Sequence, residues 1–214
     1  LKLGLQRLGF DYVDLYWLHR DDVNRPVEEI MDTLDSLRKQ GLIRWYAASN
    51  WTVPRLKAAA EYAKKKGIPT FVASQIQWSL AKMNPEGVAD PTMLEMDDDT
   101  LQFHRDTGLP IVPFSSQANG FFSGKYIKDQ PDSGRPHVRM VYGSERNWGR
   151  LERVMELSKE LGCTSNQLAL GYLISQTFQG FPIVGSRNVD QLKDSCGAAS
   201  VQLTAEQVKY LEEG

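Results

Sequence analysis

Residues 12–19 read Tyr-Val-Asp-Leu-Tyr-Trp-Leu-His, and the chain then turns from strand-forming to helix-forming residues. The first seven are rich in aromatic and β-branched types, which predicts a strand over 12–18. Pro26 suits a first helical turn, apolar residues follow at helical spacing, and Gly41 ends the helix. A second strand is predicted over 43–48, so this stretch is a β-α-β unit.

The alternation of strands and helices continues to the end of the chain. Three further strands are expected at 70–76, 110–114 and 181–184. Further helices are expected at 53–66, 93–107, 149–161, 165–178, 188–196 and 204–213. Residues 117–147 carry glycine, proline and serine without periodicity, which predicts a long irregular loop. Strict alternation predicts a parallel sheet with helical crossovers, and therefore an α/β fold.

Polar residues lie at or just after the end of each predicted strand. They are His19-Arg20-Asp21, Ser49-Asn50, Gln75, Ser115-Ser116-Gln117 and Gly185-Ser186-Arg187. No glycine-rich G-x-G-x-x-G loop follows a strand, which disfavours an open dinucleotide-binding sheet. In a TIM barrel, the strand ends converge on one mouth. The sequence therefore predicts a parallel (β/α)8 TIM barrel that is represented by five of its strands.

The composition excludes several classes of protein. The formal net charge is -2 and no basic block occurs, so neither nucleic acid nor an anionic membrane is expected as a partner. No apolar stretch approaches the about 20 residues that span a bilayer. The chain has only 2 cysteines, which favours a reducing, cytoplasmic setting. No metal site is predicted.

The strand-end segments, taken in order, resemble those of the aldo-keto reductases. Residues 9–19 resemble the family's fourth strand, residues 43–50 its fifth, and residues 74–80 its sixth. The family's seventh strand is similar to Pro113-Phe114-Ser115 with Gly120 and residues 123–126. Its eighth strand is similar to residues 183–187 with Gln191-Leu192 and residues 196–198. The chain is also similar to the subgroup that contains the potassium-channel β subunits and related bacterial reductases.

The resemblance implies an NADP(H)-dependent oxidoreductase that reduces aldehydes and ketones on a (β/α)8 barrel. The matched motifs correspond to strands four to eight, so residues 1–214 are interpreted as one domain whose N-terminal third is missing. Of the family's Asp, Tyr, Lys and His tetrad, only the histidine is matched, by His19. A completed barrel is expected to act on a small carbonyl substrate, whereas this chain alone is expected to be inactive.

The resemblance also assigns roles to the first strand ends. His19 would orient the substrate carbonyl, although an isolated strand-end histidine is usually satisfied by a backbone group. Ser49, Asn50 and Gln75 would bind the nicotinamide carboxamide, although such residues also cap strand ends. Phe114 would stack on the nicotinamide, and its alternative reading is a core phenylalanine.

The rest of the predicted cofactor site comes from later segments. Arg187 would pair with a 2′-phosphate, against a reading as a surface arginine, and Lys125 would reach the pyrophosphate. The loop over 117–147 would fold across the dinucleotide as a lid, with Arg139 as a weaker contact. The other residues assigned to NADP(H) are Ser115, Ser116, Gln117, Gly120, Gly185, Ser186, Gln191, Asp194 and Ser195.

Two hypotheses of different classes stay open. The first is an oxidoreductase of which this chain is a part. The second is a stand-alone remnant that binds NADP(H), or a partner protein, without hydride chemistry. Five strands leave two unpaired parallel edges, which favours self-association. His104 and His137 are read as surface residues.

Overall fold

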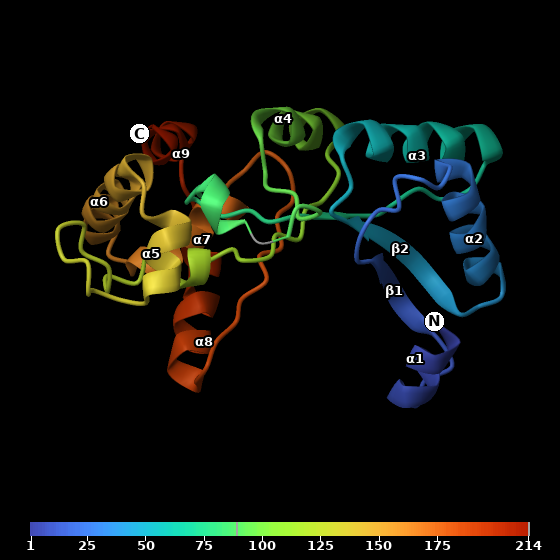
Figure 1. Cartoon of the computed structure of the whole chain (residues 1–214), viewed down its shortest axis with the longest axis horizontal. Helices are drawn as coiled ribbons and strands as arrows, with labels where there is room; N and C mark the ends of the chain where they lie inside the picture. The colour runs from blue at the N-terminus through green and yellow to red at the C-terminus, as the bar shows by residue number, and fades with distance from the viewer. Residues whose placement is uncertain (89, 214) are drawn as a thin grey trace. The chain divides into compact units, whose positions relative to one another are not determined.

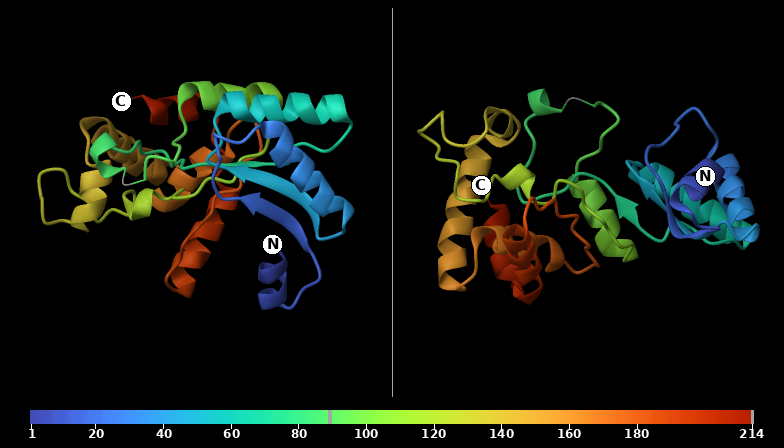
Figure 2. Two further views of the ribbon diagram at one scale, coloured as in Figure 1. Left: turned by 45° about the vertical axis from the view of Figure 1, so that its right-hand side comes forward. Right: turned by 90° about the horizontal axis from the view of Figure 1, so that it is seen from below.

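The computed structural model describes residues 1–88 and 90–213. The chain divides into two compact units, and Figures 1 and 2 show the elements of each. Unit 1 comprises Leu1–Ile76 and Asp97–Ile111, and unit 2 comprises Gln77–Met96 and Val112–Gly214. The expectation of a single domain stays a prediction.

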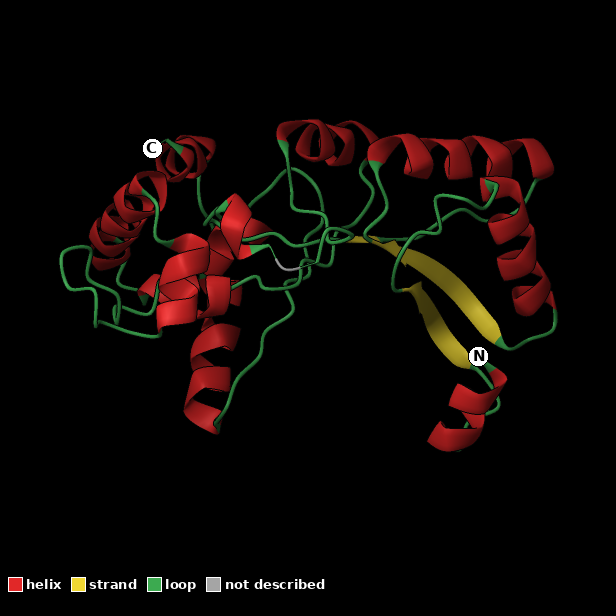
Figure 3. Ribbon diagram, viewed as in Figure 1, coloured by secondary structure: helices red, strands yellow, loops and turns green. Residues whose placement is uncertain are grey.

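Unit 1 is built on a parallel sheet. Its strands β1 (Val13–Leu18), β2 (Ile43–Ser49) and β3 (Ser74–Gln75) lie in the order β1-β2-β3 (Figure 3). Its helices are α1 (Lys2–Leu8), α2 (Val27–Lys39), α3 (Val53–Lys66) and α4 (Asp98–Thr107). The predicted β-α-β unit and its parallel pairing are therefore confirmed. The third strand is shorter than the predicted 70–76.

The core of unit 1 lies between this sheet and the helices α2 and α3. Met31 and Leu34 of α2 and Leu56 of α3 are buried with Tyr46 and Ala48 of β2. Each fully buried large side chain of this kind contributes about 1.5–3 kcal/mol relative to exposure. The apolar spacing that predicted α2 is thus the spacing of its buried face.

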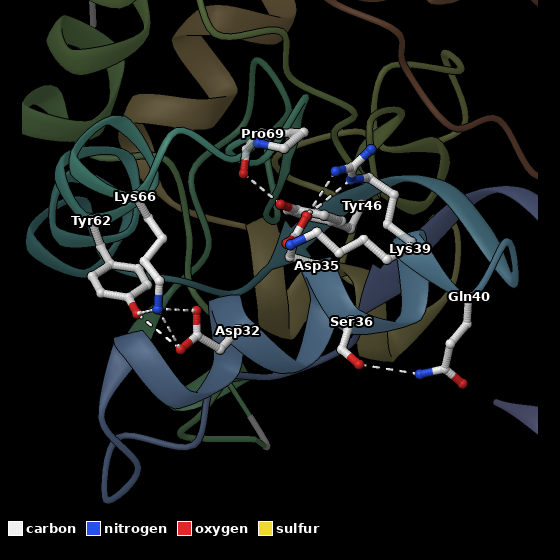
Figure 4. A network of polar contacts seen from close by, with 10 residues as sticks. Asp32, Asp35, Ser36, Lys39, Gln40, Tyr46, Tyr62, Lys66 and Pro69 are labelled. Atoms are coloured by element: carbon white, nitrogen blue, oxygen red, sulfur yellow. Dashed lines mark hydrogen bonds and ion pairs between the residues drawn. The ribbon is translucent and has the colours of Figure 1, made fainter.

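Figure 4 shows the polar contacts at the outer side of this packing. Asp32 of α2 accepts hydrogen bonds from Lys66 Nζ at 3.1 Å and from Tyr62 Oη at 2.9 Å, both on α3. Both hydrogen bonds lower the pKa of Asp32, and the bond from Lys66 has the larger effect. Because the Lys66 and Asp32 side chains are about half exposed, their ion pair contributes little to stability. Apolar burial, rather than this contact, holds the two helices together.

Unit 2 consists mainly of helices. They are α5 (Pro136–Tyr142), α6 (Glu145–Glu160), α7 (Ser165–Ile174), α8 (Val189–Gly197) and α9 (Ala205–Glu212), with short 3-10 turns η1 (Pro85–Gly87), η2 (Ala118–Gly120) and η3 (Ala198–Ser200). The middle of α7 is buried on all sides. Buried Arg150 of α6 donates to Leu80 O at 2.6 Å and to Glu212 O at 2.7 Å, which joins α6 to two other segments.

Two predicted strands are not regular strands. Segment 110–114 makes only isolated parallel bridges at Ile111 and Phe114, and segment 181–184 contributes a bond from Ile183 N to Pro113 O at 2.9 Å. Proline is the physical reason, because it has no N–H to donate to a ladder. The prolines in these segments are Pro110, Pro113 and Pro182.

The predicted irregular loop over 117–147 also needs correction. It contains the helix α5, which begins at Pro136 in the first-turn position that tolerates proline. Arg139, a weaker candidate for the cofactor, instead donates to Ile127 O and to Lys128 O, both at 2.9 Å. Arg139 therefore holds the loop to α5.

The reading of His104 as a surface residue was wrong. His104 of α4 is 0% exposed, and its Nδ1 lies 2.6 Å from Leu109 O. Burial lowers its pKa, so the folded state keeps a neutral ring. His137 is exposed, as predicted.

We expect the stability of unit 1 to fall as the pH drops below about 6.5, the unperturbed histidine pKa. Below that pH, His104 binds a proton in the unfolded chain but stays neutral in the folded one. The free energy of unfolding therefore falls by up to about 1.4 kcal/mol per pH unit. Urea midpoints between pH 7.5 and 5.5 measure this slope. His104→Gln should flatten it and His137→Gln should not; equal slopes in both variants would reject the assignment.

Candidate functional site

The first predicted site residues form a row across the sheet of unit 1. The register pairs Leu18 with Ala48 and Ser49 with Gln75, so His19 continues the same row as Ser49 and Gln75. Side chains alternate between the two faces of a strand. Leu18 and Ala48 pack into the core beneath the helices, so the next residues, His19 and Ser49, lie on the other face.

Hydrogen bonds of Asn50 hold these strand ends together. Asn50 N–H donates to Gln75 O at 2.9 Å, and Asn50 Nδ2 lies 3.0 Å from Ser49 Oγ and 3.4 Å from His19 O. Asn50 has a φ of 57°, a left-handed backbone that asparagine adopts more readily than most residues other than glycine. Ser49 and Asn50 are buried, whereas the His19 side chain is exposed.

Unit 2 contains a cleft of about 1070 Å³. Residues from the loop after Phe114, from α6, from the start of α7 and from the segment leading into α8 line it. Every predicted cofactor residue from Ser115 onward is among them: Ser115, Ser116, Gln117, Gly120, Lys125, Gly185, Ser186, Arg187, Gln191, Asp194 and Ser195. The sequence prediction therefore brought together residues that do lie around one cleft.

Phe114 does not line this cleft. It is partly buried, and its carbonyl accepts a hydrogen bond from Trp78 N at 3.2 Å. The expected stacking role of Phe114 stays a prediction, and its alternative reading as a packing residue is consistent with these contacts.

Side-chain hydrogen bonds join the walls of the cleft. Gln117 Nε2 donates to Asn166 Oδ1 at 2.9 Å and to Ser195 Oγ at 3.0 Å. Asp194 of α8 accepts from Thr164 Oγ1 and from Asn166 Nδ2, both at 2.7 Å. The start of α7, the second half of α8 and the loop after Phe114 thus share one network, which fixes the shape of this end of the cleft.

Thr164→Ala should destabilise unit 2 more than Thr204→Ala. Both threonines form a capping box with a glutamine, Gln167 or Gln207, and loss of such a cap costs about 0.5–2 kcal/mol. Thr164 also donates a hydrogen bond to the charged Asp194. Losing it lowers the free energy of unfolding by up to about 3 kcal/mol more. Urea unfolding of both variants measures the difference, and equal losses would show that the Asp194 contact contributes nothing.

The cleft is cationic. Lys125, Arg135, Lys159 and Arg187 line it, and Asp194 is the one acidic side chain among the described lining residues. A concave surface of one sign of charge attracts ligands of the opposite sign. The arrangement therefore suits an anionic ligand that has several charged groups.

Sequence reasoning missed Arg135 and Lys159. Arg135 is the residue before α5, a helix that the sequence prediction left in a loop, so nothing indicated where it would lie. Lys159 is in the last turn of α6, at helical spacing from Met155, which also lines the cleft. That spacing is the signal that could have identified Lys159.

The loop that forms one wall of the cleft has an unusual backbone. Ser115, Ala118 and Asn119 all have positive φ, between 46° and 53°. Such conformations cost of order 1–3 kcal/mol each and persist where the surrounding structure enforces them. Ser115 O accepts a hydrogen bond from Ala118 N at 2.8 Å, which closes the turn. A tight, strained turn of this type indicates a loop shaped for function.

Within the parts of the chain that the structure describes, no group of three or more His, Cys, Asp or Glu side chains could hold a metal ion. No helix over those same residues is long and apolar enough to cross a membrane.

The whole chain, residues 1–214, matches the family model of the aldo/keto reductase family. A probable aldo-keto reductase 1 from Glycine max is 28% identical over 99% of this chain and 58% of its own length. A probable aryl-alcohol dehydrogenase, AAD4, from Saccharomyces cerevisiae is 26% identical over 98% of this chain and 62% of its own length. An uncharacterized oxidoreductase, YrpG, from Bacillus subtilis is 28% identical over 100% of this chain and 61% of its own length.

A solved structure shows the same fold. The crystal structure of a thermostable aldo-keto reductase with the inhibitor epalrestat superposes with a TM-score of 0.69 at 24% identity, over 99% of this chain and 63% of that one. The chain spans about three-fifths of the length of the relatives it matches. With its parallel strands, its helical crossovers and a family match along its entire length, the chain belongs to the aldo/keto reductase family.

Proposed function

We propose that this chain is part of an NADP(H)-dependent oxidoreductase that reduces aldehyde and ketone carbonyls by hydride transfer. The observation that carries the proposal is the cationic cleft of unit 2, whose lining includes every cofactor residue expected from Ser115 onward. Family membership supports the same reaction class.

The cleft fits a phosphorylated dinucleotide in size and in chemistry. Its volume of about 1070 Å³ is slightly above the roughly 300–1,000 Å³ typical of ligand sites, as suits a large ligand. The buried Oγ of Ser186 has no hydrogen-bond partner over residues 1–88 and 90–213, and a ligand would satisfy it. Arg187 would hold the 2′-phosphate and Lys125 the pyrophosphate, while Gln191, Asp194 and Ser195 would hold the adenosine end.

In unit 1, the polar residues at the strand ends would bind the nicotinamide and the substrate. The bound nicotinamide supplies the hydride. Ser49, Asn50 and Gln75 offer both donors and acceptors for its carboxamide. His19 presents an exposed imidazole that, when neutral, can donate a hydrogen bond to a carbonyl oxygen and orient it.

We further propose that the chain represents strands four to eight of an incomplete (β/α)8 barrel. None of its residues matches the family's catalytic Asp, Tyr and Lys, so no proton donor for the new hydroxyl is assigned. An NADP(H)-binding or protein-interaction role without catalysis is the second candidate. It is favoured by one observation: the cleft is lined wholly by residues of unit 2, so this unit alone offers the proposed binding residues.

Titration of residues 1–214 with NADPH in a calorimeter tests the proposed binding. Saturable binding that adenosine 2′,5′-bisphosphate displaces is expected, because that compound carries the adenosine and 2′-phosphate that the cleft would hold. Absence of saturable binding at millimolar NADPH would refute the proposal.

Turnover separates the two candidates. We expect residues 1–214 to consume NADPH with a model aldehyde no faster than the His19→Ala variant does. A rate clearly above that variant would reject the inactive remnant and support catalysis by this chain alone.

Two further expectations accompany the proposal. Self-association is proposed because β1 is an edge strand and its neighbour Trp45 on β2 is 51% exposed, as sedimentation of the chain would test. A cytoplasmic setting is proposed because Cys163 and Cys196 are both free thiols.

A further inference from the structure

The loop that follows His19 is fixed by one arginine. Arg55 of α3 donates from Nε and Nη2 to the two carboxylate oxygens of Asp21, both at 2.7 Å. The Arg55 side chain is 20% exposed and that of Asp21 only 6%. A bidentate pair with this burial fixes geometry, whereas an exposed ion pair contributes little.

Arg55 uses its remaining donors on the same loop. Its guanidinium nitrogens donate to Asp22 O at 3.1 Å and to Arg25 O at 3.1 Å. The guanidinium also lies over the ring of buried Trp51, 5.1 Å from its centroid. One side chain thus ties residues 21–25 to the first turns of α3.

The His19 imidazole depends on this loop for its position. Within the described part of unit 1, the ring forms no hydrogen bond, so the backbone of residue 19 is what fixes the point from which the ring projects. The His19 carbonyl is held on one side by Asn50 Nδ2 at 3.4 Å and by Arg20 Nη1 at 2.8 Å. The next anchored point along the chain is Asp21, only two residues away.

We propose that Arg55 and Asp21 form a positioning pair that fixes the backbone from which the His19 imidazole projects at the end of β1. Its meaning for catalysis rests on the proposed function, in which His19 orients the carbonyl. The pair acts through the backbone of residues 19–21 and touches neither cofactor nor substrate. Lysine cannot replace Arg55, because an ammonium lacks the planar fork that reaches the carboxylate and the two carbonyls together.

The test is the ¹H–¹³C NMR spectrum of the histidine rings, since the chain has only 3 histidines. His19→Ala assigns the His19 signal. In Arg55→Lys and in Arg55→Gln we expect the His19 signal to shift or broaden. The buried His104 of the same unit should keep its signal, and so should His137 of unit 2. This readout requires no turnover, so it stands or fails independently of the proposed function.

Arg38→Lys is the matched control. Arg38 is also bonded through Nε and Nη2 to a carboxylate of unit 1, that of Asp35, but it contacts no part of the 19–25 segment. Its substitution should leave His19 unchanged. A His19 signal that is unaffected in both Arg55 variants would overturn the proposal. A shift of His104 together with His19 in Arg55→Lys would also overturn it, because the pair would then support the whole unit.

Discussion

Trp51→Ala should lower the free energy of unfolding of unit 1 by about 3–5 kcal/mol, the usual cost of removing a buried tryptophan. Trp51 is 1% exposed, and its ring meets that of Phe71 edge to face at 4.9 Å. The substitution removes this contact and leaves a cavity beneath Arg55. Urea unfolding followed by circular dichroism should show a midpoint that is roughly 1–3 M lower.

Trp45→Ala provides the matched control, because it removes the same side chain from β2 where it is 51% exposed. We expect a loss well below that of Trp51→Ala, since surface substitutions usually change stability by about 0.5 kcal/mol or less. Equal losses in the two variants would contradict the described burial of Trp51.

Arg187→Ala should weaken NADPH binding about 10- to 100-fold. A hydrogen bond to a charged group is worth about 1.5–3 kcal/mol, and each tenfold change in affinity is about 1.4 kcal/mol. NADH lacks the 2′-phosphate, so its affinity should hardly change. Calorimetric titration of both cofactors with the variant measures this difference.

Lys193→Ala tests whether any positive charge near the cleft strengthens NADPH binding. Lys193 is exposed on α8 and is not among the residues that line the cleft, so its loss should leave the affinity for NADPH within about twofold. If Arg187→Ala weakened NADPH and NADH equally, Arg187 would not be the residue that reads the 2′-phosphate.

Local patterning was enough to predict the regular part of unit 1. The aromatic and β-branched residues of 12–18 predict a strand, and the structure has β1 there. The helical spacing from Val27 to Leu37 predicts a helix, and the structure has α2 there. Patterning failed where proline interrupted it. Pro110 and Pro113 interrupt one extended segment, so its hydrogen bonds are isolated bridges rather than a ladder.

The candidate site was predictable from the polar strand ends but not from them alone. Ser115 and Arg187 stood out because they follow apolar segments, and both line the cleft. Lys159 comes from a helix, where a charged residue normally indicates a solvated face, and Arg135 immediately precedes one. The burial of His104 was missed for a related reason. Its neighbour Phe103 is apolar, but the sequence pattern does not indicate that the His104 ring is also enclosed.

The cleft of unit 2 also has a genetic consequence. Its lining runs from Ser115 to Ser195 without a contribution from any earlier residue. A single uninterrupted stretch of coding sequence therefore carries it. A recombination breakpoint between the codons for Phe114 and Ser115 would therefore keep every lining residue together. It would also exchange Gln77–Met96, the part of unit 2 that includes Leu80, whose carbonyl accepts a hydrogen bond from Arg150.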